Sequence, residues 1–464
     1  MNITDYTLSP AVSGTARTSG GDIPYRFTFE TARFTGGAEI TAFCYLKEGA
    51  APGRPVLFAT NGGPGSSVAW LHLGLLGPKR VHMDDPVAPK TTPPFSLEDN
   101  PHCPLDLCDL VLMDPPGAGF SAAPDSEHQK DYFSVDGDAG AFALFIEEWL
   151  ARHERTNSPI YFAAESYGTI RAPALMDALY GGPFASTKML TALSFSGVLF
   201  LGTAFTTAAT ILQQPPCEES VRNLLSAAAT TACHHPGRFP SPEAAADEAW
   251  AFAPRYLEAL FKGSTLPEAE RKAVAETVSR FTCIPAEKLL ARGLRYKMDE
   301  YRKSVLPGEE VGAYDGRYRM AGSAVPGSVP FPGMTDTIAD DPAMGRYCPS
   351  FSGGMAELKK AFNLPAKPYP LINLAVNSAW QYASSHPALG SLENAVRRSP
   401  DLKFFFGTGL YDLVTVAGNV RYTLAQSAIP MDRVTVREYR SGHMPYLGEE
   451  TAAALASDIR AFIR

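Results

Sequence analysis

The stretch YFAAESYGTIRAP, residues 161–173, decides the interpretation of the fold. An apolar run that predicts a buried strand leads directly into Ser166, and a helix-like stretch follows. A strand, a tight turn around one serine and a helix form the layout of a nucleophile elbow, which lifts a serine hydroxyl into a cleft. The pattern G-x-S-x-G is present with Ala164 in the first glycine position and Gly168 in the second. Serine is also common in ordinary turns, so the rest of the chain has to support this interpretation.

Segments typical of strands alternate with segments typical of helices around this elbow. This order predicts an α/β fold of the α/β-hydrolase type, in which a mostly parallel central sheet is covered by helices on both faces. The expected strands lie at 55–60, 107–114, 159–164, 190–201, 402–406 and 434–439, and the expected helices at 138–153, 169–180 and 450–463.

The alternation stops between about 205 and 370. Residues 241–261 and 268–282 have helical patterns, whereas residues 305–334 are typical of a loop. We therefore expect a catalytic domain of residues 1–204 and 371–464, with residues 205–370 inserted as a largely helical cap.

Composition and charge limit the partners and the compartment. The 464 residues include 41 Lys and Arg and 49 Asp and Glu, giving a net charge of −8 without a long basic run. This argues against nucleic acid or an anionic membrane as a partner. No apolar run approaches the roughly 18 residues of a membrane span, and the polar N-terminus lacks the features of a signal peptide. We expect a cytoplasmic protein, although a secreted chain without its signal would look the same.

The cysteines and histidines favour neither a disulfide framework nor a metal site. Seven cysteines are scattered along the chain, and this odd count suits a reducing compartment. Cys233, His234 and His235 could form half of a metal site, but no matching pair of ligands stands out elsewhere. We expect no metal and no cofactor.

Two residues after the later strands complete a catalytic triad in the order expected of this fold. Asp412 lies in a loop just past the strand at 402–406, and His443 lies between the last strand and the last helix. A serine hydroxyl is a poor nucleophile at neutral pH, so His443 would take the proton of Ser166 during attack. Asp412 would fix the tautomer of His443 and stabilise its charged form.

The glycine-rich stretch NGGPG at 61–65 predicts part of an oxyanion hole. It follows an early strand, where glycines let backbone N–H groups approach the substrate closely. We expect one donor to be the N–H of Gly63 and the other to be that of Tyr167, the residue after the nucleophile.

With these residues in place, the sequence resembles the serine carboxypeptidase family, peptidase family S10. The resemblance runs from about residue 40 to the end and covers the insertion poorly. The stretches at 66–81 and 442–463 look most like the bacterial branch. The matching stretches are NGGPGSS at 61–67, DLVLMDPPGAGFS at 109–121, ESYG at 165–168, GLYD at 409–412 and GHMPYL at 442–447.

The resemblance implies a serine-type carboxypeptidase that removes the C-terminal residue of a peptide. It implies the roles already given to the triad and to the oxyanion donors. It also implies that Asn61, Gly62 and Glu165 bind the substrate, with Asn61 and Glu165 hydrogen bonding its free carboxylate. Two ionised carboxylates repel each other, so Glu165 would have to be protonated, and peptide cleavage would favour acidic pH.

Three positions depart from the family pattern. Many members carry a second glutamate shortly before a Gly-Pro pair, and here Leu75 lies at that place. Ala59 and Thr60 replace the usual tryptophan before the glycine-rich stretch, and Ser66 replaces a cysteine of secreted eukaryotic members. The first two departures concern carboxylate recognition and leave the triad untouched.

The sequence leaves other functions open. A proline aminopeptidase would use an ionised Glu165 to bind the substrate ammonium, but such enzymes usually have histidine at position 61 and tryptophan at position 167. An esterase or acyltransferase could use the same triad, because water or an alcohol can release the acyl group. A non-enzymatic hydrolase-like protein would commonly lack a triad residue. Neither the preferred terminal residue nor the oligomeric state can be predicted.

Overall fold

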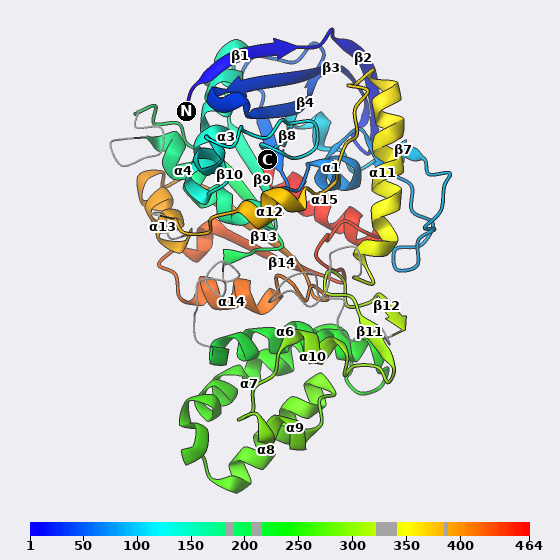
Figure 1. The fold of residues 1–464 in the computed structure, drawn as a ribbon, viewed down its shortest axis with the longest axis vertical. Helices are drawn as coiled ribbons and strands as arrows, with labels where there is room; N and C mark the ends of the chain where they lie inside the picture. The colour runs from blue at the N-terminus through cyan, green and yellow to red at the C-terminus, as the bar shows by residue number, and fades with distance from the viewer. Residues whose placement is uncertain (182–189, 206–215, 322–340, 385–387) are drawn as a thin grey trace.

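The computed structural model describes residues 1–181, 190–205, 216–321, 341–384 and 388–464, and its centre is a ten-stranded sheet (Figure 1). The strand order is β1-β3-β4-β8-β5-β9-β10-β13-β14, and β2 pairs with β3. The strands are β1 (Ile3–Leu8), β2 (Val12–Thr18), β3 (Gly21–Phe34), β4 (Glu39–Lys47), β5 (Val56–Thr60), β8 (Asp109–Asp114), β9 (Ile160–Glu165), β10 (Gly197–Leu201), β13 (Lys403–Gly409) and β14 (Val434–Tyr439).

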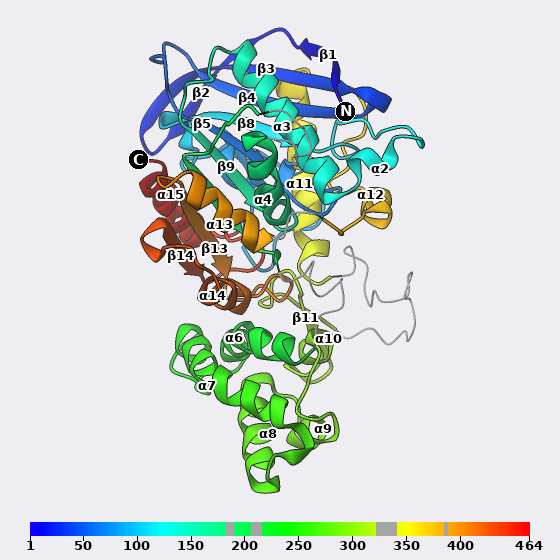
Figure 2. The ribbon, with the colours of Figure 1, turned by 90° about the vertical axis from the view of Figure 1, so that its left-hand side faces the viewer.

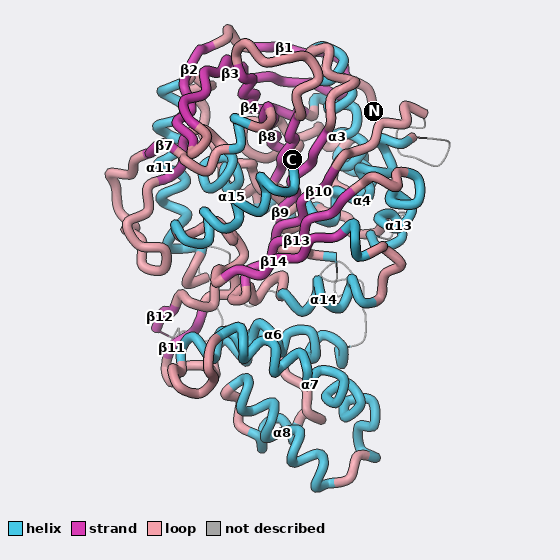
Figure 3. The backbone as a smooth tube through the Cα atoms, turned by 180° about the vertical axis from the view of Figure 1, so that it is seen from behind, coloured by secondary structure: helices cyan, strands magenta, loops and turns pink. Residues whose placement is uncertain are grey.

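The six strands from β8 to β14 in this order are parallel, so the prediction of a mostly parallel central sheet is confirmed. Their carboxyl ends lie at the same edge of the sheet, and Figure 3 shows the strands side by side. The strand expected at 190–201 is shorter than predicted. The backbone N–H groups of Ala192 and Leu193 donate to Tyr180 and Leu179 at the end of a helix, not to a neighbouring strand.

The first four strands are antiparallel, and the sequence analysis predicted no strand before residue 55. Exposed and buried residues alternate in the first half of β3, because one of its faces meets solvent there. β1, β2 and β3 lack the continuous apolar runs that mark the buried parallel strands, whereas β4 is buried along most of its length and was missed despite its apolar residues. β4 joins the two parts by pairing antiparallel with β8.

Helices cover both faces of the sheet. Figure 2 shows α3 (Val135–Arg152), α4 (Gly168–Tyr180) and α13 (Ala388–Arg398) on one face, where they bury Trp149 and Leu175 against the strands. On the other face, α1 (Ala69–Leu71), α11 (Met344–Ala361) and α15 (Glu449–Ile463) form a second core with the sheet. Burial of both faces of the sheet is typical of α/β proteins, and it fixes the loops at the strand ends.

A helical unit lies beyond the carboxyl edge of the sheet, at the bottom of Figure 1. It has its own core, centred on Tyr256, Val278 and Tyr301, and α6 packs against α14 (Ala417–Ala425) of the main body. Its helices are α6 (Pro216–His234), α7 (Pro242–Lys262), α8 (Glu268–Thr282), α9 (Ala286–Ala291) and α10 (Met298–Arg302).

Part of the stretch assigned to the cap packs elsewhere. Tyr347 and Phe351 of α11 lie in the core beside the sheet, so the division of the chain at residues 204 and 370 stays a prediction. Within the expected loop at 305–334, a short hairpin forms from β11 (Glu309–Val311) and β12 (Arg319–Ala321), and residues 322–334 lie outside the described residues. The remaining elements are β6 (Lys79–Val81), β7 (Leu97–Asp99), α2 (Gln129–Tyr132) and α12 (Leu374–Ala379).

Two further features bear on the expected compartment. In the described parts of the chain, no helix combines the length and the apolar character needed to cross a membrane. The six cysteines whose side chains are described carry free thiols: Cys44, Cys103, Cys108, Cys233, Cys283 and Cys348.

Candidate active site

Ser166 lies at a strained turn between β9 and α4. Its φ angle is 57°, a left-handed conformation that is rare for a residue with a side chain. The turn is held because the Ser166 N–H donates to Leu201 O at 2.9 Å and its carbonyl accepts from Thr169 N at 2.8 Å. A Cβ atom added to Gly62 would lie 2.3 Å from the N atom of Tyr167, so only glycine lets the two loops approach this closely. Backbone strain of this kind is typical of a nucleophile elbow.

Asp412 and His443 meet at the carboxyl ends of β13 and β14. His443 Nδ1 lies 2.9 Å from Asp412 Oδ2. Asp412 is fully buried and accepts from the backbone N–H groups of Val414 at 2.9 Å and Thr415 at 2.8 Å. The Thr415 hydroxyl also donates to Asp412 Oδ2 and lies 3.0 Å from His443 Nδ1. The sequence analysis missed Thr415, because a threonine three residues after an aspartate resembles an ordinary turn.

The charges around His443 stabilise its protonated form. Burial alone would lower the pKa of its imidazole, but the Asp412 carboxylate, together with Glu165 and Asp341, outweighs that effect, and the pKa lies above the usual value. The backbone N–H of His443 donates to Tyr314 O at 2.6 Å, which ties its loop to the segment between β11 and β12.

One pocket is lined by six of the eight residues that the sequence assigned to chemistry and to substrate binding, and Asp412 and Tyr167 are not among its lining residues. Ser166 and His443 both line it, and in the described structure no hydrogen bond joins their side chains. Such contacts are often long without substrate and tighten when it binds. The other lining residues are Asn61, Gly62, Gly63, Ser66, Trp70, Glu165, Tyr314, Met344, Ile372 and Met444.

The proposed oxyanion donors lie on two loops that approach each other. Gly63 has a φ angle of 100°, which requires glycine, and Tyr167 follows the nucleophile directly. Neither backbone N–H donates a hydrogen bond to another group in the described parts of the chain. Both donors are therefore free to bind a developing negative charge.

Asn61 and Glu165 form a buried pair in the pocket that Ser166 also lines. Asn61 Nδ2 donates to Glu165 Oε1 at 2.7 Å, and Asn61 Oδ1 accepts from the N–H of Leu71 at 3.1 Å. Glu165 is 3% exposed. Burial raises the pKa of its carboxyl to about 7, against the opposing effects of His443, Tyr446 and Asn61. The side chain is therefore a neutral acid across the acidic pH range.

A buried ion pair supports the floor of this site. Arg171 of α4 donates from Nε to Asp138 Oδ2 at 2.6 Å and from Nη1 to Asn61 O at 2.9 Å. The Tyr167 hydroxyl also donates to Asp138 Oδ2, at 3.3 Å. Arg171 and Asp138 are both fully buried. No sequence pattern predicts this pair, because its members come from different helices.

The departures from the family pattern have structural counterparts. Leu75 is buried in the core beside the sheet. The pocket contains a tryptophan from α1, Trp70, whose indole N–H donates to Ser66 Oγ at 2.9 Å.

The histidines considered as metal ligands have other partners. His234 Nε2 lies 2.6 Å from Gly316 O, and His235 Nε2 lies 2.8 Å from Val305 O. In the described ranges, no group of three or more His, Cys, Asp or Glu side chains could hold a metal ion.

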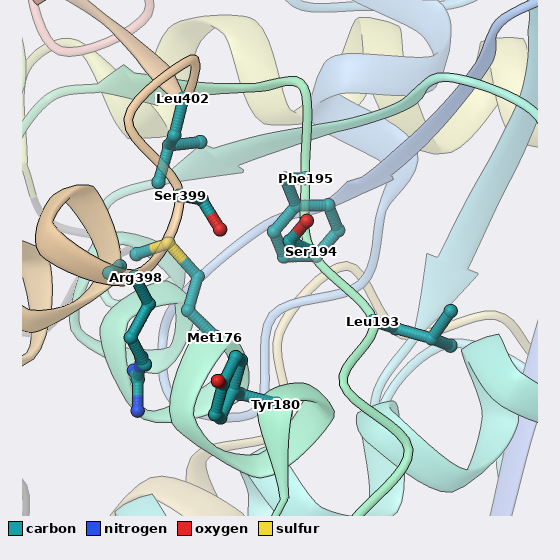
Figure 4. Close-up of a pocket in the computed structure, with 9 residues that line it drawn as sticks. Met176, Tyr180, Leu193, Ser194, Phe195, Arg398, Ser399 and Leu402 are labelled. Atoms are coloured by element: carbon teal, nitrogen blue, oxygen red, sulfur yellow. The ribbon is translucent and has the colours of Figure 1, made fainter.

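A second hollow lies away from these residues, where α4, the chain before β10 and the end of α13 meet (Figure 4). None of the predicted site residues lines it. Met176, Leu193, Phe195 and Leu402 give it mostly apolar walls, and Arg398 at its side is paired with Asp177.

Known proteins support the resemblance found in the sequence. The serine carboxypeptidase family model matches residues 42–218. Serine carboxypeptidase-like 5 of Arabidopsis thaliana is 31% identical over 136 residues, which cover 28% of this chain and 29% of that protein. Serine carboxypeptidase-like 2 of the same plant is 30% identical over 175 residues, which cover 36% of this chain and 37% of that protein.

A solved structure supports the fold. The prohormone-processing carboxypeptidase Kex1Δp of Saccharomyces cerevisiae superimposes with a TM-score of 0.52 over 92% of this chain and 87% of that chain, at 14% identity. The resemblance to serine carboxypeptidases and the α/β-hydrolase fold are thereby confirmed. The sequence matches span less than two fifths of either plant relative, and the bacterial branch stays a prediction.

Proposed function

We propose that this chain, a relative of the serine carboxypeptidases, hydrolyses the C-terminal peptide bond of peptides through an acyl-enzyme on Ser166. The observation that carries the proposal is the buried Asn61–Glu165 pair in the pocket that Ser166 and His443 also line. The family match covers residues 42–218, which include Asn61, Glu165 and Ser166, and it supports the hydrolase class. Asp412 and His443 lie outside that match and are proposed from their contacts.

The triad supports an acyl-transfer mechanism. His443 would take the proton of Ser166 as its Oγ attacks the carbonyl carbon of the last peptide bond. The Asp412 carboxylate would stabilise the charged imidazole, and the N–H groups of Gly63 and Tyr167 would bind the oxyanion. The C–N bond then breaks, and His443 gives its proton to the departing amino group. Water, activated by His443, attacks the ester and releases the shortened peptide.

The Asn61–Glu165 pair explains why the bond would be the last one in the chain. A neutral Glu165 can donate a hydrogen bond to the free carboxylate of a terminal residue, together with the amide of Asn61. An ionised Glu165 would repel that carboxylate. Because burial raises the pKa of Glu165 to about 7, the clamp would bind peptide acids in acid and lose them above neutrality.

The same observation argues against an aminopeptidase. That activity would need an ionised carboxylate to bind an ammonium group, whereas the buried Glu165 keeps its proton up to about pH 7. Ester cleavage and acyl transfer use the same triad, so the specificity for a free carboxylate is the property that distinguishes the proposal.

Cleavage of an N-blocked dipeptide and of its C-terminal amide, measured from pH 4 to pH 9, tests the function. We expect the ratio of kcat/KM for the acid to that for the amide to exceed one at low pH and to fall as the pH rises through about 7, whereas protonation of His443 affects both substrates alike. Ser166→Ala should lose both activities by several orders of magnitude. Equal rates on acid and amide at every pH would contradict carboxylate recognition, and full activity in Ser166→Ala would contradict the nucleophile.

A further inference from the structure

The hydroxyl of Tyr446 and one carboxylate oxygen of Glu165 are both buried and both lack a hydrogen-bond partner among the described residues. The two side chains are neighbours, because the Tyr446 hydroxyl lowers the pKa of Glu165 and Glu165 raises the pKa of Tyr446. Asn61 is a neighbour of both, because it lowers the pKa of each group. Glu165 Oε1 is already used by Asn61, at 2.7 Å, so Oε2 is the oxygen that remains without a donor. A buried carboxylate without such a donor would be costly.

The position of Tyr446 is fixed by the structure. It lies in the loop that carries His443, just before α15, and it is 3% exposed. Its ring packs against Gly74 so closely that a Cβ atom added there would lie 2.4 Å from ring atom Cε2. The phenol ring is therefore held in place against Gly74.

The groups that shift the pKa of Glu165 come from three loops at the strand ends. Asn61 follows β5, Asp412 follows β13, and His443 and Tyr446 follow β14. Burial and the Asp412 carboxylate favour the neutral form of Glu165, whereas His443, Tyr446 and Asn61 favour the ionised form. Tyr446 differs from the other two, because its hydroxyl and Glu165 Oε2 both lack a hydrogen-bond partner among the described residues.

We propose that Tyr446 is a positioning residue for C-terminal carboxylate recognition: its hydroxyl donates to Glu165 Oε2 when Glu165 is ionised, and so sets the pH above which the clamp rejects a peptide acid. This inference rests on the proposed carboxypeptidase function. Removing the hydroxyl takes away a donor to the charged form, so Glu165 would stay neutral to higher pH.

The test compares wild type with Tyr446→Phe on the N-blocked dipeptide acid and its amide. We expect the pH at which the acid-to-amide ratio of kcat/KM falls by half to rise by about one unit, because hydrogen bonds to charged groups are strong. Tyr161→Phe is the matched control. Tyr161 lies on β9, the strand that ends at Glu165, and its hydroxyl donates to Ile463 O at 3.0 Å. Loss of this hydroxyl should leave the pH at which the acid-to-amide ratio falls by half unchanged.

A double-mutant cycle separates this role from a general structural one. In Glu165→Gln the side chain cannot ionise, so the ratio should become independent of pH near neutrality, and adding Tyr446→Phe should produce no shift. Gly74→Ala provides a second variant, because the added methyl group would displace the Tyr446 ring. It should raise the midpoint, meaning the pH at which the acid-to-amide ratio of kcat/KM falls by half, as Tyr446→Phe does.

The outcomes distinguish the two proposals. An acid preference in wild type together with an unchanged or lowered midpoint in both Tyr446→Phe and Gly74→Ala would overturn the role of Tyr446 alone. A shift of equal size in the Glu165→Gln background would also overturn it. No acid preference in wild type would instead contradict the proposed function.

Discussion

At the scale of single residues, Thr415 is the least expected part of the site. Its hydroxyl donates to Asp412 Oδ2 and lies 3.0 Å from His443 Nδ1, so one side chain contacts both the proposed acid and the proposed base. Its backbone N–H also donates to Asp412, at 2.8 Å. These contacts would restrict the Asp412 carboxylate to the orientation that the His443 ring requires.

Replacing Thr415 by valine removes the hydroxyl and keeps the backbone contact and the branched shape. We expect kcat on the dipeptide acid to fall by roughly tenfold with little change in KM, because a hydrogen bond to a charged group is lost. Thr277→Val on α8 is the control, since its hydroxyl donates to Ala273 O within a helix of the distant helical unit. A Thr415→Val enzyme with wild-type kcat would show that the backbone donors orient Asp412 without the hydroxyl.

At the scale of elements, the Arg171–Asp138 ion pair connects three of them. Asp138 belongs to α3 and Arg171 to α4, and Arg171 also donates to the carbonyl of Asn61 at the end of β5. Burial raises the pKa of Asp138, against the charge of Arg171. A charged pair in the core stabilises little by itself, but a charge left without its partner is expensive.

Arg171→Met should therefore destabilise the protein by about 3–5 kcal/mol, because it leaves Asp138 buried and unpaired. Chemical denaturation measures this loss. The double variant Asp138→Leu with Arg171→Met should recover a large part of it, since no uncompensated charge remains. If the double variant were as unstable as the single one, the cost would come from lost packing and from the lost contact to Asn61, and not from the charge.

At the scale of the whole molecule, Glu165 makes stability depend on pH. Its pKa rises from the usual 4.5 to about 7 in the folded chain, so the folded state binds this proton more tightly than the unfolded state. The stabilisation is complete below about pH 4.5 and is lost as the pH rises to about 7. The site thus reduces the stability of the fold at neutral and alkaline pH.

Glu165→Gln keeps a hydrogen-bond acceptor for Asn61 and cannot ionise. Relative to wild type, its free energy of unfolding should improve by about 3 kcal/mol between pH 4 and pH 8. Urea titrations at the two pH values measure the change. Parallel pH dependences for the two proteins would mean that Glu165 ionises in the fold without cost, and that substrate discrimination has another origin.

The sequence by itself determined the parallel strands, the elbow at Ser166, the order in which Asp412 and His443 follow it and the resemblance to serine carboxypeptidases. These features leave local signals, because a buried strand is a continuous apolar run and a catalytic loop directly follows it. The sequence analysis missed the antiparallel strands β1 to β4. In β3 the apolar residues are interrupted by polar ones on the solvent face, whereas β4 is buried along most of its length.

Only the tertiary structure decided which side chains surround the chemistry. Thr415, Arg171 and Tyr446 are common residues in unremarkable contexts, and each has a partner 28, 33 or 281 positions away: His443, Asp138 and Glu165. The packing of α11 beside the sheet was likewise not apparent from its sequence. The physical reason is that burial, which raises the pKa of Glu165, and hydrogen bonding between distant loops are properties of the folded arrangement, and no local pattern encodes them.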